Sequence, residues 1–274
     1  MRFYIQKDRY NENRNDWIYK AVKDGLQIVE TPEESDAFLV IGGDGSLLSA
    51  VRDQTRLRKP ILALNGGTVG ANLIDVTKEN ITEIISEIQM GCVSIESYPV
   101  FNVQAKDAKG NAFKRTVFND AWVDRLGATS VRYRSKMIFQ GQEHELSDFD
   151  FSGDGILFSS ATGSTGYARM NYDIILPHGM NVVLCVPMAS VINKRKVPAT
   201  MIGVGDEFIV EFVDTEFRPT RLAVDGVYLK NDDGSDFCPV SISVMTNSER
   251  EEWIKMITLT RHEHHAKQFN FIGR

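Results

Sequence analysis

The sequence has few cysteines, no long apolar run and no excess of positive charge. Cys92, Cys185 and Cys238 lie far apart in the chain of 274 residues, which excludes a disulfide framework and a cysteine-based zinc site and is typical of a reducing compartment. No stretch approaches the roughly 20 apolar residues that span a bilayer. Residues 1–16 lack the apolar core of a signal peptide. We therefore expect a cytoplasmic protein that does not bind membranes.

The charge balance limits the partners. With 31 Lys and Arg residues against 37 Asp and Glu residues, the formal net charge is −6. The chain thus lacks the basic surface with which proteins neutralise nucleic-acid phosphates, and we predict no nucleic-acid partner. What is present is an ordinary globular composition, with 42% hydrophobic and 25% charged residues. At this length, two domains are expected.

Two halves of the chain differ in pattern. Within residues 1–98, short apolar runs such as 36–41 alternate with segments of helical periodicity. This alternation predicts an α/β domain with a parallel sheet. Residues 99–245 hold β-rich segments bounded by turn residues, which predicts a larger, sandwich-like β domain. We expect residues 246–274 to return to the first domain and pack on it.

A dense glycine segment, GGDGS at residues 42–46, follows the first buried run and precedes a helical pattern. Ligands of parallel α/β domains bind beyond the carboxyl ends of the strands, where glycines and a helix N-terminus offer backbone N–H groups to an anion. Two interpretations stay open. Asp44 either serves a phosphate site, through a metal or as a base for a hydroxyl, or it caps the helix in a tight turn. The spacing matches neither a Walker A loop nor a dinucleotide-binding GxGxxG loop.

Two later segments carry polar residues in apolar surroundings. Asn119 and Asp120 lie within residues 117–124, which we interpret as one strand, and a buried Asn–Asp pair is costly unless it is hydrogen-bonded. The pair either satisfies itself or binds an adenine edge and a ribose hydroxyl. Residues 153–167 alternate Gly, Ser and Thr after a strand, which indicates a loop that binds a sugar or phosphate, or an ordinary loop. Residues 224–226, VDG, read as a strand that ends in a turn.

These motifs, in this order, resemble those of the NAD kinases. The family carries a GGDG loop, an asparagine–acidic pair, a GDG with a following TGST-type loop and tyrosine, and a late DG after a strand, here residues 42–45, 119–120, 153–155, 162–167 and 225–226. The pattern extends over residues 37–230. The GGDG loop alone is shared with diacylglycerol and sphingosine kinases, whereas the combination is much more specific.

The resemblance implies transfer of a phosphoryl group from ATP, or from polyphosphate in some members, to the 2′-hydroxyl of the adenosine ribose of NAD. By the same resemblance, Asp44 accepts the hydroxyl proton. The implied nucleotide and phosphate site is formed by Gly42, Gly43, Gly45 and Ser46. The implied NAD site is formed by Asn119, Asp120, Asp154, Thr162, Thr165, Gly166 and Tyr167. Asp154 is expected to act across a subunit interface, in a homodimer or homotetramer.

Mg²⁺ or another divalent cation is expected on the donor phosphates rather than on protein ligands. The histidines at 262, 264 and 265 have no carboxylate cluster beside them that would complete a metal site. The chain departs from the family at Ala71–Asn72, where Phe-Leu is usual, and at residues 168–174, where a small glycine-containing stretch is usual. We expect Met170, Tyr172 and Asp173 to alter the pocket wall and weaken NAD binding.

Two alternative functions belong to other classes. A lipid kinase of the diacylglycerol or sphingosine type shares the GGDG loop, but the chain shows no basic, membrane-facing helix. The second alternative is a non-catalytic nucleotide-binding module on the same fold. Asp44 argues against this alternative, because a binding module would not need its carboxylate, whereas the altered pocket wall favours the alternative.

Overall fold

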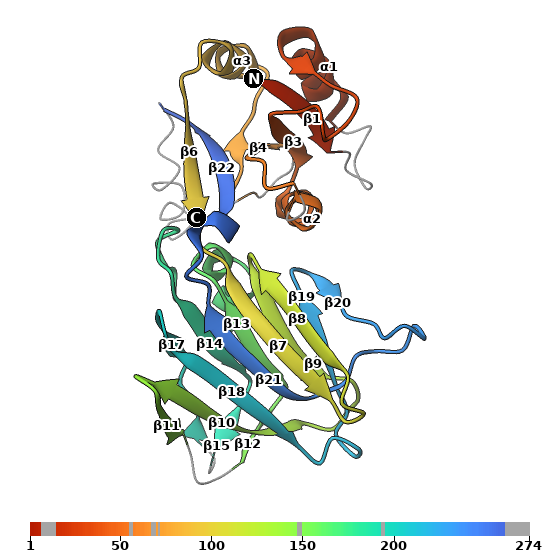
Figure 1. The fold of residues 1–274 in the computed structure, drawn as a ribbon, viewed down its shortest axis with the longest axis vertical. Helices are drawn as coiled ribbons and strands as arrows, with labels where there is room; N and C mark the ends of the chain where they lie inside the picture. Colours follow the sequence, from red (N-terminus) through yellow and green to blue (C-terminus); the bar gives the residue numbers. More distant parts are fainter. Residues whose placement is uncertain are drawn as a thin grey trace. The chain divides into compact units, whose positions relative to one another are not determined.

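The chain divides into two compact units, which are described separately (Figure 1). Unit 1 is Met1–Tyr98 with the chain from Glu252 onward, and unit 2 is Pro99–Glu251. The structure is a computed structural model, and it describes residues 1–6, 15–54, 57–66, 70, 72–146, 150–192 and 195–260. Within these residues, no helix is long and apolar enough to cross a membrane.

Unit 1 contains a seven-stranded sheet with the order β2-β1-β3-β4-β22-β6, in which β5 also pairs with β4. The strands are β1 (Arg2–Gln6), β2 (Gln27–Ile28), β3 (Ala37–Gly42), β4 (Ile61–Asn65), β5 (Ile74–Asp75), β6 (Val93–Tyr98) and β22 (Ile254–Leu259). Strands β1 to β5 pair in parallel. The returning strand β22 lies between β4 and β6, parallel to the first and antiparallel to the second (Figure 1).

The helices of unit 1 follow from the periodicity of the sequence. They are α1 (Asp16–Gly25), α2 (Asp44–Gln54) and α3 (Ile81–Gln89). Helix α3 buries Ile81, Ile84 and Ile88, which recur at helical spacing, in the core of the unit. Every residue of β3 and β4 is buried, as expected for strands covered on both faces. The predicted α/β domain is therefore confirmed, with an antiparallel edge strand, β6, added to its parallel sheet.

Unit 2 is a sandwich of a nine-stranded and a six-stranded sheet. The larger sheet contains β7 (Phe101–Asp107), β8 (Ala112–Val117), β10 (Val131–Phe139), β11 (Gln142–Glu145), β12 (Phe151–Gly153), β15 (Val191–Ile192), β16 (Arg195–Lys196), β18 (Glu207–Val213) and β21 (Pro239–Thr246). The smaller sheet contains β9 (Asp120–Arg125), β13 (Gly155–Ser159), β14 (Val183–Met188), β17 (Thr200–Ile202), β19 (Thr220–Val224) and β20 (Val227–Tyr228). This larger β-rich unit confirms the predicted fold class.

The core of unit 2 lies between the sheets. Val103, Tyr133 and Val210 of the larger sheet pack in one cluster with Val123 and Phe158 of the smaller sheet. The 3₁₀ helix η2 (Thr162–Thr165) is followed by the short helix α4 (Tyr167–Asn171). Tyr167 and Ala168 of α4 pack in a second apolar cluster on the outer face of the smaller sheet. A further 3₁₀ turn, η3 (Arg250–Glu252), precedes β22.

The prediction of one strand over residues 117–124 is wrong. Strand β8 ends at Val117 in the larger sheet and β9 begins at Asp120 in the smaller one, so Phe118 and Asn119 form the bend by which the chain changes sheets. The apolar pattern hides this crossing because both sheets bury residues in the same core. The chain crosses again at Asp154, between β12 and β13.

Candidate functional site

The GGDG segment of unit 1 joins β3 directly to α2. Gly42 is the last residue of β3 and Asp44 is the first residue of α2, so Gly43 alone separates them. The backbone N–H groups of Ser46 and Leu47 donate to the Gly43 oxygen at 3.0 and 3.2 Å, which closes the first helical turn. The helix thus begins earlier than the glycines suggested, and its N-terminus lies at the carboxyl end of β3.

The surroundings of this loop suit an anion. The first N–H groups of a helix have no intrahelical acceptor, and they carry the positive end of the helix dipole. Among the described residues, a Cβ placed on Gly45 would meet no atom within 4 Å, so the space beside this glycine is open. Asp44 is half-buried, and its Oδ1 atom is buried. Gly43 holds the N-cap position, because its oxygen accepts the first helical hydrogen bonds, so the interpretation of Asp44 as the cap is wrong. The carboxylate of Asp44 lies in the first turn, where the helix dipole favours it.

The neighbouring strand ends at the same level. The Gly66 N–H group donates to the Gly42 oxygen at 3.0 Å, and the Asn65 side-chain amide donates to Asp75 Oδ1 at 2.7 Å. The ends of β3 and β4 therefore form the edge of the sheet where parallel α/β proteins bind ligands. Ala71, one of the departures from the family pattern, lies outside the described residues, as do the histidines near the C-terminus.

In unit 2, the bend at Phe118–Asn119 is bound by the carboxylate of Asp225. Asp225 Oδ1 accepts the N–H groups of Asn119 at 2.7 Å and Asp120 at 3.3 Å, and Oδ2 accepts that of Phe118 at 3.1 Å. In return, the Asp225 N–H group donates to the Asp120 oxygen at 2.8 Å. The bend before β9 and the turn after β19 therefore form one hydrogen-bonded structure.

The TGST loop packs on the other side of this bend. The Ser160 N–H group donates to the Asn119 oxygen at 2.9 Å, and Ser160 Oγ donates to the Phe118 oxygen at 2.6 Å. A Cβ on Gly163 would lie 2.2 Å from the Asn119 oxygen, so only glycine fits there. Gly166 also lies beside the Asn119 side chain, since a Cβ at Gly166 would be 3.7 Å from Asn119 Nδ2. The structure thus brings the bend and the TGST loop together.

Two buried polar atoms of this site lack a protein partner. Asn119 Oδ1 and Thr162 Oγ1 accept or donate no hydrogen bond among the described residues. Leaving such an atom unsatisfied costs about 1–3 kcal/mol. Native proteins rarely keep such atoms without water or a ligand to bind them. In the same loop, Thr165 Oγ1 donates to the Thr162 oxygen at 3.3 Å and so shapes the loop. The pair Asn119 and Thr162 therefore indicates a polar ligand.

Asp120 adds an unusual carboxylate. Burial, and second the charge of Asp225, raise the pKa of Asp120 to about 7. Within the described part of the chain, hydrogen bonding makes no contribution to this shift. Asp120 thus changes charge near neutral pH, at the edge of the site that Asn119 and Thr162 define.

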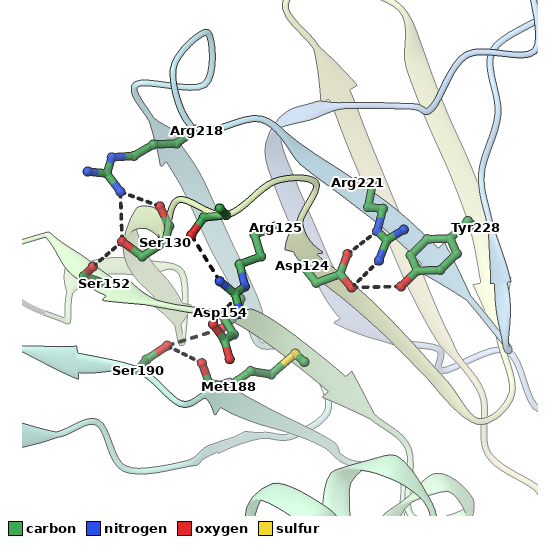
Figure 2. A network of polar contacts seen from close by, with 12 residues as sticks. Asp124, Arg125, Ser130, Ser152, Asp154, Met188, Ser190, Arg218, Arg221 and Tyr228 are labelled. Atoms are coloured by element: carbon green, nitrogen blue, oxygen red, sulfur yellow. Dashed lines mark hydrogen bonds and ion pairs between the residues drawn. The ribbon is translucent and has the colours of Figure 1, made fainter.

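Tyr167 and an aromatic network border the site. The Tyr167 ring meets Trp122 edge-on at 5.4 Å, and Trp122 meets Tyr228 at 5.9 Å. Arg221 lies 3.9 Å over the Tyr228 ring and donates to Asp124 at 2.9 and 3.3 Å, and the Tyr228 hydroxyl also donates to Asp124 (Figure 2). Burial first, and then nearby carboxylates that include Asp120, raise the pKa of Tyr167.

Asp154 is separated from the residues around Asn119. Gly155 pairs with Asp124 and Ser159 pairs with Asp120, so Asp154 and Asp120 lie at opposite ends of one strand pair, roughly 16 Å apart at 3.3 Å per residue. The Asp154 carboxylate forms an ion pair with Arg125 at 3.1 Å (Figure 2). Both side chains are well exposed, so this pair contributes little stability.

The unusual segment after Tyr167 does not narrow the site from within its unit. Met170 is 82% exposed, and Asp173 forms an exposed ion pair with Arg169. The Tyr172 hydroxyl donates to the Val197 oxygen, and its ring lies 4.3 Å below Lys196 Nζ. Tyr172 therefore packs as a structural side chain, because the outer face of the smaller sheet needs an apolar cover.

Sequence reasoning identified the 225–226 turn and left Asp225 without a role. The turn itself is confirmed, since β19 ends at Val224 and β20 begins at Val227. Asp225 has a φ of 45° and Gly226 a φ of 79°, which is typical of a two-residue hairpin turn with an Asp-Gly sequence. That signal predicts the turn but gives no indication of which backbone groups the carboxylate binds.

Both units have counterparts in known proteins. The yeast NADH kinase complexed with NADH has a TM-score of 0.78 at 15% identity, over 98% of this chain and 86% of that chain. An NAD kinase from Archaeoglobus fulgidus in complex with ATP has a TM-score of 0.69 at 17% identity, over 98% of both chains. The chain therefore shares its fold with these two structures.

Comparison of the sequence with known proteins found NAD kinases. Residues 5–92 match the ATP-NAD kinase N-terminal domain. The NAD kinase of Aquifex aeolicus is 30% identical over 158 residues, which are 57% of this chain and 55% of that protein. The NAD kinase of Lachnospira eligens is 26% identical over 230 residues, 80% of this chain and 74% of that protein. The sequence is thus similar to NAD kinases in its N-terminal part and, at lower identity, over most of its length. It spans a little over half the length of the Aquifex relative.

Proposed function

We propose that this protein is an NAD kinase, which transfers the γ-phosphoryl group of ATP to the 2′-hydroxyl of the adenosine ribose of NAD. One observation carries the proposal: the buried Asn119 Oδ1 and Thr162 Oγ1 atoms have no hydrogen-bond partner among the described residues, and they lie on two segments that match the family pattern. The names of the relatives support it, as do the NADH and ATP in the two structural counterparts.

The acceptor is bound by unit 2 in this proposal. Asn119 Oδ1 accepts a hydrogen bond from the adenine amine, and the ionised Asp120 carboxylate accepts one from a ribose hydroxyl. Thr162 Oγ1 supplies a further polar contact, and Thr165, Gly166 and Tyr167 line the same pocket. These polar groups have already lost their water in the folded protein, so a hydrogen bond from the ligand to each of them favours binding.

Asp44 is the proposed general base. It takes the proton of the 2′-hydroxyl as that oxygen attacks the γ-phosphorus. The bond from the γ-phosphorus to the β–γ bridging oxygen breaks, and ADP leaves. Backbone N–H groups of Gly43 and Gly45, together with the Ser46 hydroxyl, bind phosphate oxygens at the start of α2. Gly42 is the last residue of β3, and because it has no side chain, the phosphates of ATP can approach the backbone there.

Mg²⁺ or another divalent cation is proposed to arrive with the donor phosphates. In the part of the chain that the structure describes, no three His, Cys, Asp or Glu side chains form a metal-binding group. We propose that the cation would be held mainly by phosphate oxygens, where it would neutralise charge. ATP is the proposed donor, and polyphosphate is the alternative.

We further propose a cytoplasmic homodimer or homotetramer. The Asp154 side chain is 47% exposed, which leaves it accessible to the ligand of a second copy. The lipid-kinase alternative gains no support from the residues at the site, because Asn119, Asp120 and Thr162 are polar.

An acceptor screen tests the function. The protein is incubated with γ-labelled ATP and Mg²⁺, and with NAD, NADH, diacylglycerol or sphingosine. We expect label in NADP or NADPH alone. Label in a lipid would establish the lipid-kinase alternative, and ATP binding without transfer to any acceptor would establish the non-catalytic one.

A further inference from the structure

Asp225 is a buried carboxylate with an unusual set of partners. It is 4% exposed, and burying a carboxylate is costly unless hydrogen bonds compensate for the lost water. Its two oxygens accept three consecutive backbone N–H groups, those of Phe118, Asn119 and Asp120. Charge-assisted hydrogen bonds of this kind are stronger than neutral ones.

The three N–H groups need such a partner because of where they lie. Strand β8 ends at Val117 and β9 begins at Asp120 in the other sheet. The bend between them therefore lacks a regular ladder for its N–H groups, and buried N–H groups are almost always paired. Ser160 binds the oxygens of Phe118 and Asn119 from the TGST loop. The bend is thus held by Asp225 at its N–H groups and by Ser160 at its carbonyl groups.

This arrangement fixes the two residues that the proposed acceptor site needs. The bend orients Asn119 so that Oδ1 stays unpartnered among the described residues. It also places Asp120 at the start of β9, beside the Asp225 charge that helps to raise its pKa. Tyr167, at the start of α4, also interacts electrostatically with Asp120.

We propose that Asp225 is the positioning residue for acceptor binding, since its carboxylate holds the Phe118–Asp120 backbone in the geometry that presents Asn119 and Asp120 to the ligand. This inference rests on the proposed function for the identity of the acceptor. Asp225 acts through the backbone of the bend and through its charge, and it needs no contact with the acceptor.

The test compares Asp225→Asn with a matched control, Asp107→Asn. Asp107 is also a buried carboxylate of unit 2, and it accepts the N–H groups of Lys109 and Asn111 at 2.9 and 2.8 Å in the β7–β8 hairpin. It is the last residue of β7, at the far end of the β7–β8 pair from Val117. Both variants lose carboxylate–backbone hydrogen bonds, but only Asp225→Asn loses them at the bend.

Steady-state kinetics and amide exchange are the measurements. We expect Asp225→Asn to raise the KM for NAD by about tenfold or more, the effect of weakening hydrogen bonds to a charged group, with kcat and the KM for ATP changed less than about threefold. Asp107→Asn should leave all three within about twofold. The midpoint of the pH dependence of the NAD KM should fall in Asp225→Asn, since one of the two causes of the raised Asp120 pKa is gone.

Hydrogen exchange of the backbone amides of residues 118–120 is measured in the ligand-free wild type and in both variants. Protection lost in Asp225→Asn and kept in Asp107→Asn supports the positioning role, and a wild type that binds no NAD would then refute the proposed function alone. Equal NAD KM values in the two variants, with an unchanged pH midpoint, would overturn the inference. If Asp225→Asn does not fold, amide exchange of the wild type is the test. Rapid exchange of the amides of residues 119 and 120 would overturn the positioning role of Asp225. Protection equal to that of the rest of strand β9 would support it.

Discussion

Gly163 lies so close to Asn119 that a Cβ on the glycine would be 2.2 Å from the Asn119 backbone oxygen. The same Cβ would lie 2.7 Å from the Asn119 carbonyl carbon. These distances are far inside van der Waals contact, and backbone atoms cannot rotate away as a flexible side chain can. The two segments that the sequence marked as candidate NAD-binding elements therefore hold each other at a fixed distance.

Gly163→Ala is expected to destabilise the protein by about 1–3 kcal/mol, the usual cost of overpacking a tight interior, and to weaken NAD binding. Gly127→Ala is the matched control, because a Cβ at Gly127 meets nothing within 4 Å among the described residues. Thermal unfolding and NAD titration measure both effects. If Gly163→Ala unfolds at the same temperature as Gly127→Ala, the close packing of the two segments is wrong.

Asp44→Asn should lower kcat by about 10²–10⁴-fold, since the amide cannot accept the hydroxyl proton. NAD affinity should stay within about twofold, because the residues proposed to bind NAD are unchanged. Asp16→Asn is the control, as Asp16 is the acidic first residue of α1 just as Asp44 is that of α2. A wild-type kcat in Asp44→Asn would show that Asp44 takes no part in catalysis.

The raised pKa of Asp120, about 7, predicts a pH-dependent acceptor affinity. Because the ionised carboxylate accepts the ribose hydroxyl, the KM for NAD should rise as the pH falls from 8 to 6. Asp120→Asn should bind NAD more weakly and without that pH dependence. A wild-type KM that is flat across this range would contradict the proposed role of Asp120.

The ionisation of Asp120 should also affect folding stability. A rise in pH should strengthen NAD binding but lower the stability of the folded protein. The folded protein binds the Asp120 proton more tightly than the unfolded chain does, with a pKa raised from 3.8 to about 7. Asp120 therefore contributes stability that is complete below pH 3.8 and is lost as the pH rises through 7. Above pH 7, Asp120→Asn should unfold at a higher temperature than the wild type, because the buried charge is removed.

A homo-oligomer predicts concentration-dependent activity. If Asp154 of one copy serves the ligand of another, activity per chain should fall on dilution below the dissociation constant of the assembly. Light scattering and activity over the same concentrations measure this. A monomer that is fully active at every concentration would show that Asp154 of one copy does not serve the ligand of another.

The sequence predicted the fold class because the decisive signals are local. Strands β3 and β4 are continuous apolar runs with glycine at or after their ends, and α3 repeats its apolar residues at helical spacing. The position of β22 between β4 and β6 was not predictable in this way, since that pairing joins segments far apart in the chain. No periodicity within residues 254–259 specifies their neighbours.

The candidate site shows the same limit. Glycines and hydroxyl residues marked the loops, but the crossing at Phe118–Asn119 was read as a continuous strand. The role of Asp225 was missed because its carboxylate acts on backbone N–H groups that lie 105 to 107 residues earlier. Backbone partners leave no signal in the identity of the residues that supply them.

Separate calorimetric titrations of NAD and ATP into the wild type and Asn119→Ala test the central claim most directly. The account predicts that the wild type binds both ligands. Asn119→Ala should lose about 1–3 kcal/mol of NAD binding, the cost of a missing partner for a buried polar group, and should bind ATP as before. Asn111→Ala, in the β7–β8 hairpin, should bind both ligands like the wild type. Equal losses for NAD and ATP in Asn119→Ala, or a wild type that binds no NAD, would contradict the account.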